Sequence, residues 1–322
     1  GLLGMPLTVD ALGASAPSAS SSARAALSLT ADASDESWKD LVKYARGGVA
    51  TGELRKQLTN VLGPIVNAPP WLQRGALLRT TDVDLPSEWA SYRDFALARA
   101  EASQAPLLWV ASNDSMLHAF NANDGSPVMS YLPSALMGGL RLASLESTKS
   151  ITATMDGGPF TADIHLDDGA AGVWRTYLFS SLGRGGKAVF ALDATNPAAL
   201  TERNANGVFK WMFSAADDAD LGYVLMDPVV HRSSGQPANV VRLNTGHFAL
   251  MIPNGYGSSN GLAALYFLDV AGRQADGTWG GARLKKLVAS ETDSDNGMMG
   301  ATWVDIDNNG TVFYGRFDKE TN

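Results

Sequence analysis

The sequence contains no cysteine, which excludes a disulfide framework, a thiolate metal site and a cysteine nucleophile. It contains no run of Lys and Arg, and its net charge of −8 argues against nonspecific binding to nucleic acid, whose phosphates attract clustered positive charge. It also has no apolar run of about 18 residues or more, so we expect no transmembrane segment. The 33 glycines and 14 prolines, many of them at the ends of apolar segments, favour a turn-rich all-β body.

The sequence also lacks the short motifs of common catalytic sites. No GxSxG elbow, Walker loop or HExxH zinc motif is present, and the four histidines show no metal-ligand spacing. His118 lies inside an apolar segment, where we expect it to face a neighbouring sheet. The glycine-rich residues 183–186 precede a strand, whereas a dinucleotide-binding loop opens a helix, so they predict a tight hairpin turn. Asp167 and Asp168 stand before Gly169 and predict a turn rather than a hydrolytic carboxylate pair. Because none of these motifs indicates a catalytic site, we expect that the chain is not an enzyme.

An internal repeat is the most informative feature of the sequence. An apolar strand, a glycine- or asparagine-containing turn and a second apolar strand recur, and the second strand ends on Asn121, Asp193 and Asp269. Successive copies therefore lie 72 and 76 residues apart (193 − 121 and 269 − 193). A period of this size with several short strands predicts four-stranded antiparallel units placed side by side in a propeller-like array.

Each unit can be divided into strands from its apolar segments. The first unit should contain strands near 107–111, 116–121 and 127–132. The second unit should contain strands near 159–166, 175–180, 187–193 and 208–213. The third unit should open with a strand at Pro228 and continue with strands near 247–252, 262–269 and 283–288. A fourth unit should open near Ala301. The openings at 159, 228 and 301 repeat with nearly the same period as the inner strands, which supports the repeat independently.

The residues before the repeats predict a different structure. Residues 1–36, which are rich in Ala and Ser, have little bulky apolar surface and should form a linker or lead-in. Residues 37–104 should form short helices and an extended connector that pack on the propeller, and the blades should occupy residues 105–322. We expect the helices at 37–47, 51–62 and 86–100 and the connector at 67–71.

The best candidate for a metal site is the loop at 305–311. Acidic and amide side chains at its first, third and fifth positions, with glycine at the sixth, are typical of a loop that curls around Ca²⁺. The ligands would be the side chains of Asp305, Asp307 and Asn309 and the main-chain carbonyl of Thr311. The alternative is an Asx-rich hairpin turn without an ion. Mg²⁺ fits less well because it prefers fewer protein ligands.

Other polar and aromatic clusters have simpler explanations. The acidic loops at 217–220 and 293–295 could bind calcium, but clustered acids on a loop are usually a solvated surface. Several tryptophans fall at strand positions, where packing between sheets explains them better than sugar stacking: Trp109, Trp174, Trp211 and Trp303.

Four long motifs follow one another along the chain: LLWVASNDSMLHAFNANDG (107–125), WRTYLFSSLGRGGKAVFALDATNP (174–197), PNGYGSSNGLAALYFLD (253–269) and DSDNGMMGATWVDIDNNG (293–310). Together, and in this order, they resemble the PilY/PilC family of proteins associated with the tip of the type IV pilus. The resemblance extends over roughly residues 40–310. It departs from the family at the ninth position of the loop at 305–311, where the family usually has Asp and this chain has Phe313.

The resemblance implies a fold and a function. The fold should be a quinoprotein-like modified β-propeller of four-stranded antiparallel blades, with a small helical lead-in. The chain should act in pilus assembly, retraction control and adhesion, outside the cell or at the outer membrane. It should contact minor pilins at the pilus tip and a surface receptor. In the family this loop binds Ca²⁺, which maps onto Asp305, Asp307, Asn309 and Thr311.

Two alternatives remain open at this point. A quinone-dependent dehydrogenase on a related propeller would need a polar cofactor pocket and commonly a vicinal cysteine pair, and the chain has no cysteine. A carbohydrate-binding or carbohydrate-hydrolysing propeller would need exposed aromatic side chains and paired acids at one mouth of the ring.

Overall fold

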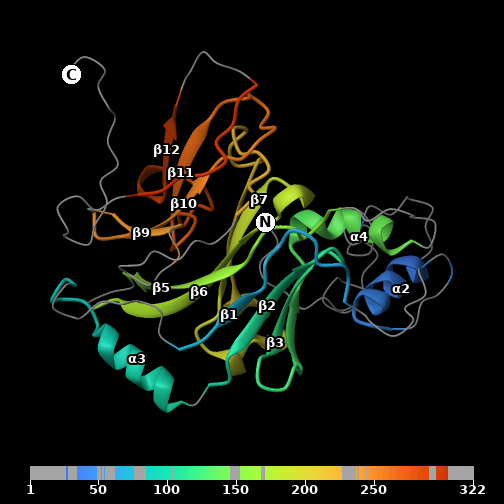
Figure 1. Ribbon diagram of the computed structural model, residues 1–322, viewed down its shortest axis with the longest axis horizontal. Helices are drawn as coiled ribbons and strands as arrows, with labels where there is room; N and C mark the ends of the chain where they lie inside the picture. Colours follow the sequence, from blue (N-terminus) through green and yellow to red (C-terminus); the bar gives the residue numbers. More distant parts are fainter. Residues whose placement is uncertain are drawn as a thin grey trace.

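The computed structural model shows a mostly β protein with a few short helices (Figure 1). The structure describes residues 27, 35–48, 52, 54, 62–75, 85–102, 104–145, 153–167, 171–226, 237, 239–243, 245–289 and 295–303. Every structural statement below concerns these residues.

Three four-stranded antiparallel sheets form the body of the described chain, and within each sheet the strands follow chain order. Blade 1 contains β1 (Trp71–Gln73), β2 (Leu107–Ser112), β3 (Met116–Asn121) and β4 (Pro127–Tyr131). Blade 2 contains β5 (Phe160–Leu166), β6 (Val173–Ser181), β7 (Ala188–Asp193) and β8 (Phe209–Ser214). Blade 3 contains β9 (Val240–Arg242), β10 (Phe248–Pro253), β11 (Ala264–Asp269) and β12 (Leu284–Val288). The predicted four-stranded meander is confirmed.

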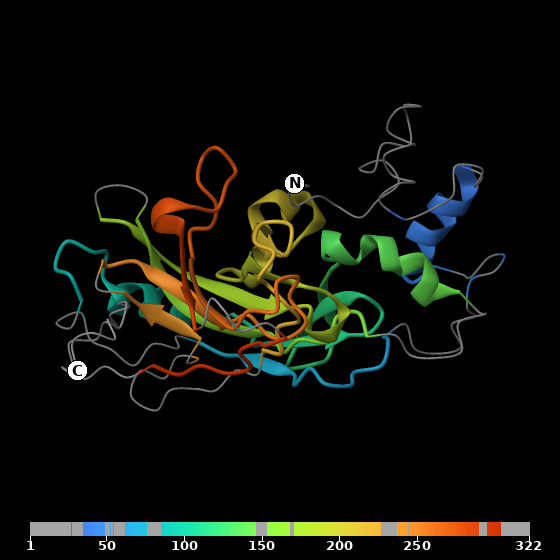
Figure 2. The same cartoon turned by 90° about the horizontal axis from the view of Figure 1, so that it is seen from above.

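Helices occupy the segments before and between the blades. They are α2 (Asp35–Ala45), α3 (Tyr92–Glu101), α4 (Met137–Ser144) and the single turn α5 (Ala205–Val208). Leu41 and Val42 of α2 pack against Met137 and Leu140 of α4. Leu27, from the segment predicted to be a loose linker, is fully buried in the same cluster. In Figures 1 and 2 these two helices lie at the opposite end of the molecule from blade 3.

Blade 2 lies between the other two blades, and both of its faces are covered (Figure 1). Side chains alternate along β7, so Phe190 and Leu192 pack with the core of blade 1 while Val189 and Ala191 pack with blade 3. A strand buried on both faces needs apolar residues at every position, which explains the unbroken sequence AVFAL.

Blade 3 shows the same alternation, with a different neighbour on each face. Phe248, Leu250 and Ile252 of β10 pack towards blade 2. Ala249 and Met251 point to the opposite face, where they form a separate apolar cluster with Val241, Leu243 and Phe267. The partly buried Ala301 and Trp303 pack against this cluster. The chain that leads into the predicted metal loop is therefore placed on the outer face of blade 3.

The repeated acidic or amide residue has a structural role in every blade. The side-chain oxygens of Asn121, Asp193 and Asp269 each accept a hydrogen bond from the backbone N–H two residues later, at 3.0, 2.9 and 2.8 Å. This Asx-turn ends the third strand of the blade and starts the reversal towards the fourth. The residue that revealed the repeat is thus a turn residue, and the repeat reflects architecture rather than chemistry.

Helix α3 is attached to blade 2 by a buried polar cluster that we call the α3 anchor. The carboxylate of Asp163 in β5 is fully buried and accepts hydrogen bonds from Tyr92 Oη at 2.8 Å and Thr176 Oγ1 at 2.5 Å. Arg99 Nη1 lies 3.2 Å from the same carboxylate, and the Arg99 side chain is only 8% exposed. Ser91 caps the N-terminus of the helix by accepting from the backbone N–H of Asp94.

Two expectations about the helices of the lead-in need revision, and the connector predicted at 67–71 leads into a strand. β1 begins at Trp71, the last residue of that connector, and pairs with β2. The first blade therefore takes its first strand from before the boundary predicted at residue 105. Leu54 forms an isolated bridge with Leu145 and Leu62 lies in a bend, so the predicted helix at 51–62 is not present at these two residues. The helix predicted at 86–100 begins later, at Tyr92.

The opening strands predicted for the third and fourth units also need revision. The strand that pairs with β10 is β9, which begins twelve residues after Pro228 (240 − 228). Pro228 itself lies outside the described residues, as do residues 304–322. Residues 301–303 are not part of a strand, so the fourth unit remains a prediction.

Candidate functional site

The predicted metal ligands Asp305, Asp307, Asn309 and Thr311 lie outside the described residues. The structure nevertheless fixes the chain just before them. The backbone N–H of Gly255 donates to the carbonyl of Met298 at 2.8 Å, and Met298 N donates to Asn254 Oδ1 at 3.0 Å. Met298 thus lies beside the turn between β10 and β11, and Trp303, the last described residue, packs on blade 3.

Asn254 joins three loops at this end of blade 3. Its side chain is fully buried, and its Nδ2 donates to the carbonyls of Asp220 and Leu262 at 2.8 and 2.6 Å. Its Oδ1 accepts from the backbone N–H groups of Ala264 and Met298, both at 3.0 Å. Every hydrogen-bonding position of the amide is used, which a buried amide requires. We call this arrangement the Asn254 hub.

The acidic loop at 217–220 is neutralised from within the protein. Lys286 Nζ of β12 lies 3.0 Å from both carboxylate oxygens of Asp218 and makes a short contact with Asp220. Asn260 Nδ2 donates to Asp220 at 2.6 Å, and Arg273 pairs with Asp217 at 2.8 Å. Asp220 is 4% exposed, so the expectation of a solvated acidic surface was wrong for this residue. Lys286, Asp218 and Asp220 form the Lys286 cluster.

The Lys286 cluster predicts how stability depends on pH. Burial raises the pKa of Asp220, but hydrogen bonds from Lys286 and Asn260 outweigh it and hold the pKa below the usual 3.8. Burial lowers the pKa of Lys286, but its bonds to Asp220 and Asp218 outweigh this and raise the pKa above 10.5. The stabilisation should be complete between the unfolded-state pKa values of about 4 and about 10, and should be lost as the pH passes the shifted values on either side.

A comparison of the wild type with the variant Lys286→Met tests this dependence of stability on pH. We expect the difference in melting temperature between the wild type and Lys286→Met to stay constant from about pH 5 to 9 and to shrink in acid, because Asp220 then becomes protonated in both proteins. A difference that does not change with pH would contradict an electrostatic role for Lys286. The segment LKKLV contains two lysines, and nothing in the sequence shows that Lys286 rather than Lys285 pairs with the acidic loop.

The histidines do not gather at one place. His118 lies on the face of blade 1 that points away from blade 2, so the expectation that it faces a neighbouring sheet was wrong for the described chain. His165 stacks on Trp89, and His247 lies 3.5 Å from Asp269. His231 lies outside the described residues. Within the described ranges no group of three or more His, Cys, Asp or Glu side chains could hold a metal ion.

The glycine-rich residues 183–186 form a tight turn between β6 and β7, as predicted. Gly183 has a φ of +57°, and a Cβ atom on Gly185 would lie 1.6 Å from the carbonyl oxygen of Thr154. The glycines therefore permit close packing of two backbones, and this explains them without a phosphate ligand. Asp167 follows β5 directly, whereas Asp168 and Asp293 lie outside the described residues.

The predicted packing role of the tryptophans is confirmed. Trp109, Trp174 and Trp211 are each at most 3% exposed, and Trp303 packs against blade 3. Sequence reasoning missed Trp89, which lies before α3 and stacks on His165 with a ring distance of 4.0 Å and an angle of 8°. Its ring also lies 6.1 Å from that of Phe248, so one side chain joins blades 2 and 3.

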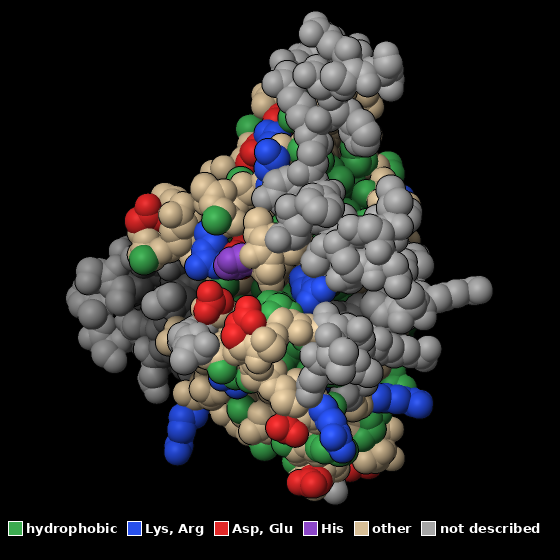
Figure 3. Space-filling view, turned by 90° about the vertical axis from the view of Figure 1, so that its left-hand side faces the viewer, with side chains coloured by type: hydrophobic (Ala, Val, Ile, Leu, Met, Phe, Trp, Pro, Cys, Tyr) green, Lys and Arg blue, Asp and Glu red, His purple; other side chains and the backbone are tan. Residues whose placement is uncertain are grey.

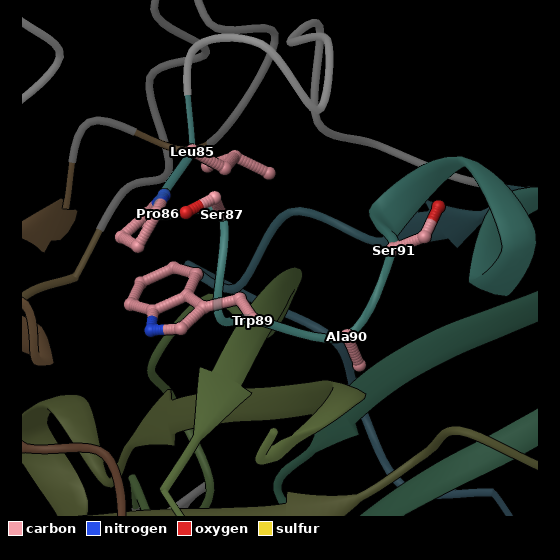
Figure 4. A pocket seen from close by; sticks show the side chains of 6 residues that line it. All are labelled: Leu85, Pro86, Ser87, Trp89, Ala90 and Ser91. Carbon is pink, nitrogen blue, oxygen red and sulfur yellow. The ribbon is translucent and has the colours of Figure 1, made fainter. Parts of the chain in front are cut away.

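A hollow of about 270 Å³ lies in the bend of residues 85–91 (Figure 4). The Trp89 ring lies across from Pro86, with Leu85 and Ser87 above it. This volume is at the lower end of ligand pockets, which span roughly 300–1,000 Å³. Trp89 is already stacked on His165, so the hollow is best explained by the way residues 85–91 pack across blades 2 and 3. We assign no ligand to it.

On the face drawn in Figure 3, the acidic and basic side chains of the described residues are interspersed. This face does not carry the clustered positive charge that attracts the phosphates of nucleic acids, in agreement with the net negative charge of the whole sequence. Among the helices that the structure describes, none is long and apolar enough to cross a membrane.

Known proteins match this architecture in both sequence and structure. The family model described as the PilY1 beta-propeller domain matches residues 62–319. The type IV pilus biogenesis factor PilY1 of Pseudomonas aeruginosa (strain UCBPP-PA14) is 31% identical over 263 residues, which cover 80% of this chain and 20% of that protein. A PilY1 homolog of Xylella fastidiosa (strain Temecula1 / ATCC 700964), also described as a type IV pilus biogenesis factor, is 32% identical over 250 residues, which cover 70% of this chain and 19% of that protein.

A solved structure agrees with these matches. The crystal structure of the Pseudomonas aeruginosa PilY1 C-terminal domain superposes with a TM-score of 0.55 and 28% sequence identity, covering 75% of this chain and 41% of that one. The chain thus spans about a fifth of the length of the curated relatives. The long collinear motifs in the sequence and the stacked four-stranded blades in the structure identify the same family.

Proposed function

Because the chain belongs to the PilY1 β-propeller domain family, we propose that it acts in type IV pilus biogenesis as a calcium-modulated, non-enzymatic propeller. The family match and the stacked blades support this proposal, and Ala301 and Trp303, which precede the candidate calcium loop in sequence, pack against the outer face of blade 3. A conformational change in that loop on ion binding would be transmitted to the residues that precede it, and of these Met298 is hydrogen-bonded to Asn254 in blade 3.

The donor set of the loop supports calcium. Asp305, Asp307 and Asn309 offer carboxylate and amide oxygens, and Thr311 offers a carbonyl, all of which are hard ligands. These four would provide part of the six to eight oxygens that Ca²⁺ takes, and water would fill the rest. Phe313 stands where a further acidic ligand is common, so we expect an affinity below that of a complete loop.

Titration calorimetry tests the calcium site. The wild type should bind one Ca²⁺, and Asp305→Ala should weaken binding by more than the roughly 10–100-fold that follows loss of a group outside the first coordination sphere. Asp276→Asn is a matched control, because it also removes one carboxylate, from an exposed turn of blade 3. Absence of binding to the wild type, or unchanged binding to Asp305→Ala, would refute the site.

We further propose that the propeller works outside the cell or at the outer membrane, at the pilus tip, in contact with minor pilins and with a surface receptor. The absence of cysteine in the sequence is compatible with an oxidising compartment, because there is no free thiol to oxidise. The relatives named as type IV pilus biogenesis factors support the process in which it acts.

A chimera tests the cellular role. Residues 62–319 should replace the matching segment of Pseudomonas aeruginosa PilY1, and surface pili and twitching motility should then be measured. We expect pili to assemble with the wild-type segment and calcium-dependent motility to change with Asp305→Ala. A chimera that is stable and secreted but supports no pili would contradict the proposal.

A further inference from the structure

Three side chains on the outer face of blade 1 form a hydrogen-bonded chain that the proposed function does not use. Ser130 Oγ of β4 lies 2.8 Å from His118 Nδ1 of β3. His118 Nε2 lies 2.9 Å from Asp114 Oδ2, in the turn between β2 and β3. His118 and Ser130 are direct partners across the two strands, so the register of the sheet fixes their approach.

The carboxylate of Asp114 is itself held in place. Its Oδ1 accepts from the backbone N–H of Met116 at 3.0 Å, and its Oδ2 accepts from the backbone N–H of Gly63 at 3.1 Å. A carboxylate only accepts hydrogen bonds, so the His118 Nε2 that faces it must carry the proton. The neutral ring then has its lone pair on Nδ1, which points at the Ser130 hydroxyl.

This geometry is that of a serine next to a base whose ring is oriented by a third group. Ser130 is exposed, whereas His118 and Asp114 are only 12% and 21% exposed. The base is thus partly shielded from water while the nucleophile is accessible.

We propose that Ser130 is a nucleophilic serine and a site of O-acylation by activated acyl esters. Ser130 Oγ attacks the ester carbonyl and forms the new C–O bond while its proton passes to His118 Nδ1. The old ester C–O bond then breaks, and the leaving oxygen takes that proton from His118. The products are acyl-Ser130 and a free alcohol or phenol, and no oxidant or further reactant is needed. The protein is the acceptor in a single turnover.

The experiment uses p-nitrophenyl acetate and the whole chain. Nitrophenol should be released stoichiometrically as the peptide that contains Ser130 is acetylated. Mass spectrometry of that peptide measures the acetylation. General-base assistance typically contributes about 10²–10⁴-fold, so Ser130 should react about 100-fold or more faster than an unassisted serine. Ser126 supplies the reference within the same hairpin, because it is exposed and its hydroxyl donates to the Asp124 carboxylate, which is a far weaker base than an imidazole.

Three variants separate nucleophile, base and positioning residue. Ser130→Ala should abolish acetylation at residue 130. His118→Gln should reduce the rate of acetylation of Ser130 to that of Ser126. Asp114→Asn should reduce it too, and nitrogen-15 shifts of the His118 ring should report a change of tautomer, which a merely structural role would not produce. Thermal unfolding checks that each variant is folded. Equal labelling of Ser126 and Ser130 in the wild type, or labelling of Ser130 that His118→Gln leaves unchanged, would overturn the proposal.

Discussion

Replacing Asp163 by Ala should lower the free energy of unfolding by about 3–5 kcal/mol, because it leaves the charge of Arg99 buried without its partner. Asp163 is fully buried, and Arg99 is 8% exposed. The substitution also removes the acceptor for the hydroxyls of Tyr92 and Thr176. A total stability of about 5–15 kcal/mol is usual for a domain, so this loss would affect folding at physiological temperature.

Urea denaturation of Asp163→Ala and of the double variant Asp163→Leu/Arg99→Met separates the buried charge from the packing. The double variant should recover most of the stability, since replacing both members of a buried ion pair with apolar groups is often neutral. Tyr92→Phe is the control for the hydroxyl alone and should cost only about 1–3 kcal/mol. If the double variant is as unstable as Asp163→Ala, the uncompensated charge is not the cause.

The repeat could be predicted from the sequence because its signals are local. The Asx-turns at Asn121, Asp193 and Asp269 need only the residues that follow them. The long strands of blade 2 contain enough apolar residues to show a pattern. The strands β1 and β9 have three residues each, which is too short for any periodicity to be visible. They form because a neighbouring strand presents an unpaired edge, and that is a tertiary effect.

The polar sites show the same division between local and long-range signals. The loop at 305–311 can be predicted as a metal site because its candidate ligands are close in sequence. The α3 anchor joins Arg99 to Asp163, and the Lys286 cluster joins a strand to a loop more than sixty residues earlier. The contact between His118 and Ser130 depends on strand register, which includes an irregularity between Ala119 and Phe120. No spacing in the sequence could reveal these pairs.

Replacing Phe190 by Ala should lower the free energy of unfolding by about 3–5 kcal/mol, because the cavity would open in the interface between blades 1 and 2. Phe190 is fully buried, and its ring lies 5.1 Å from that of Tyr131 in β4. The backbone of β7 is fixed by strands on both sides, so the site cannot easily collapse around the smaller residue.

Phe120→Ala is the matched control, since Phe120 has the same side chain but is only partly buried on the outer face of blade 1. Its loss should cost clearly less than that of Phe190 in the same urea titration, because the energy lost follows the apolar surface that burial had removed from water. Equal losses would mean that the interface between blades 1 and 2 adds little to stability. A larger loss for Phe190 would show that the blades stabilise one another through their contact faces, so that the stability of any one blade depends on its neighbours.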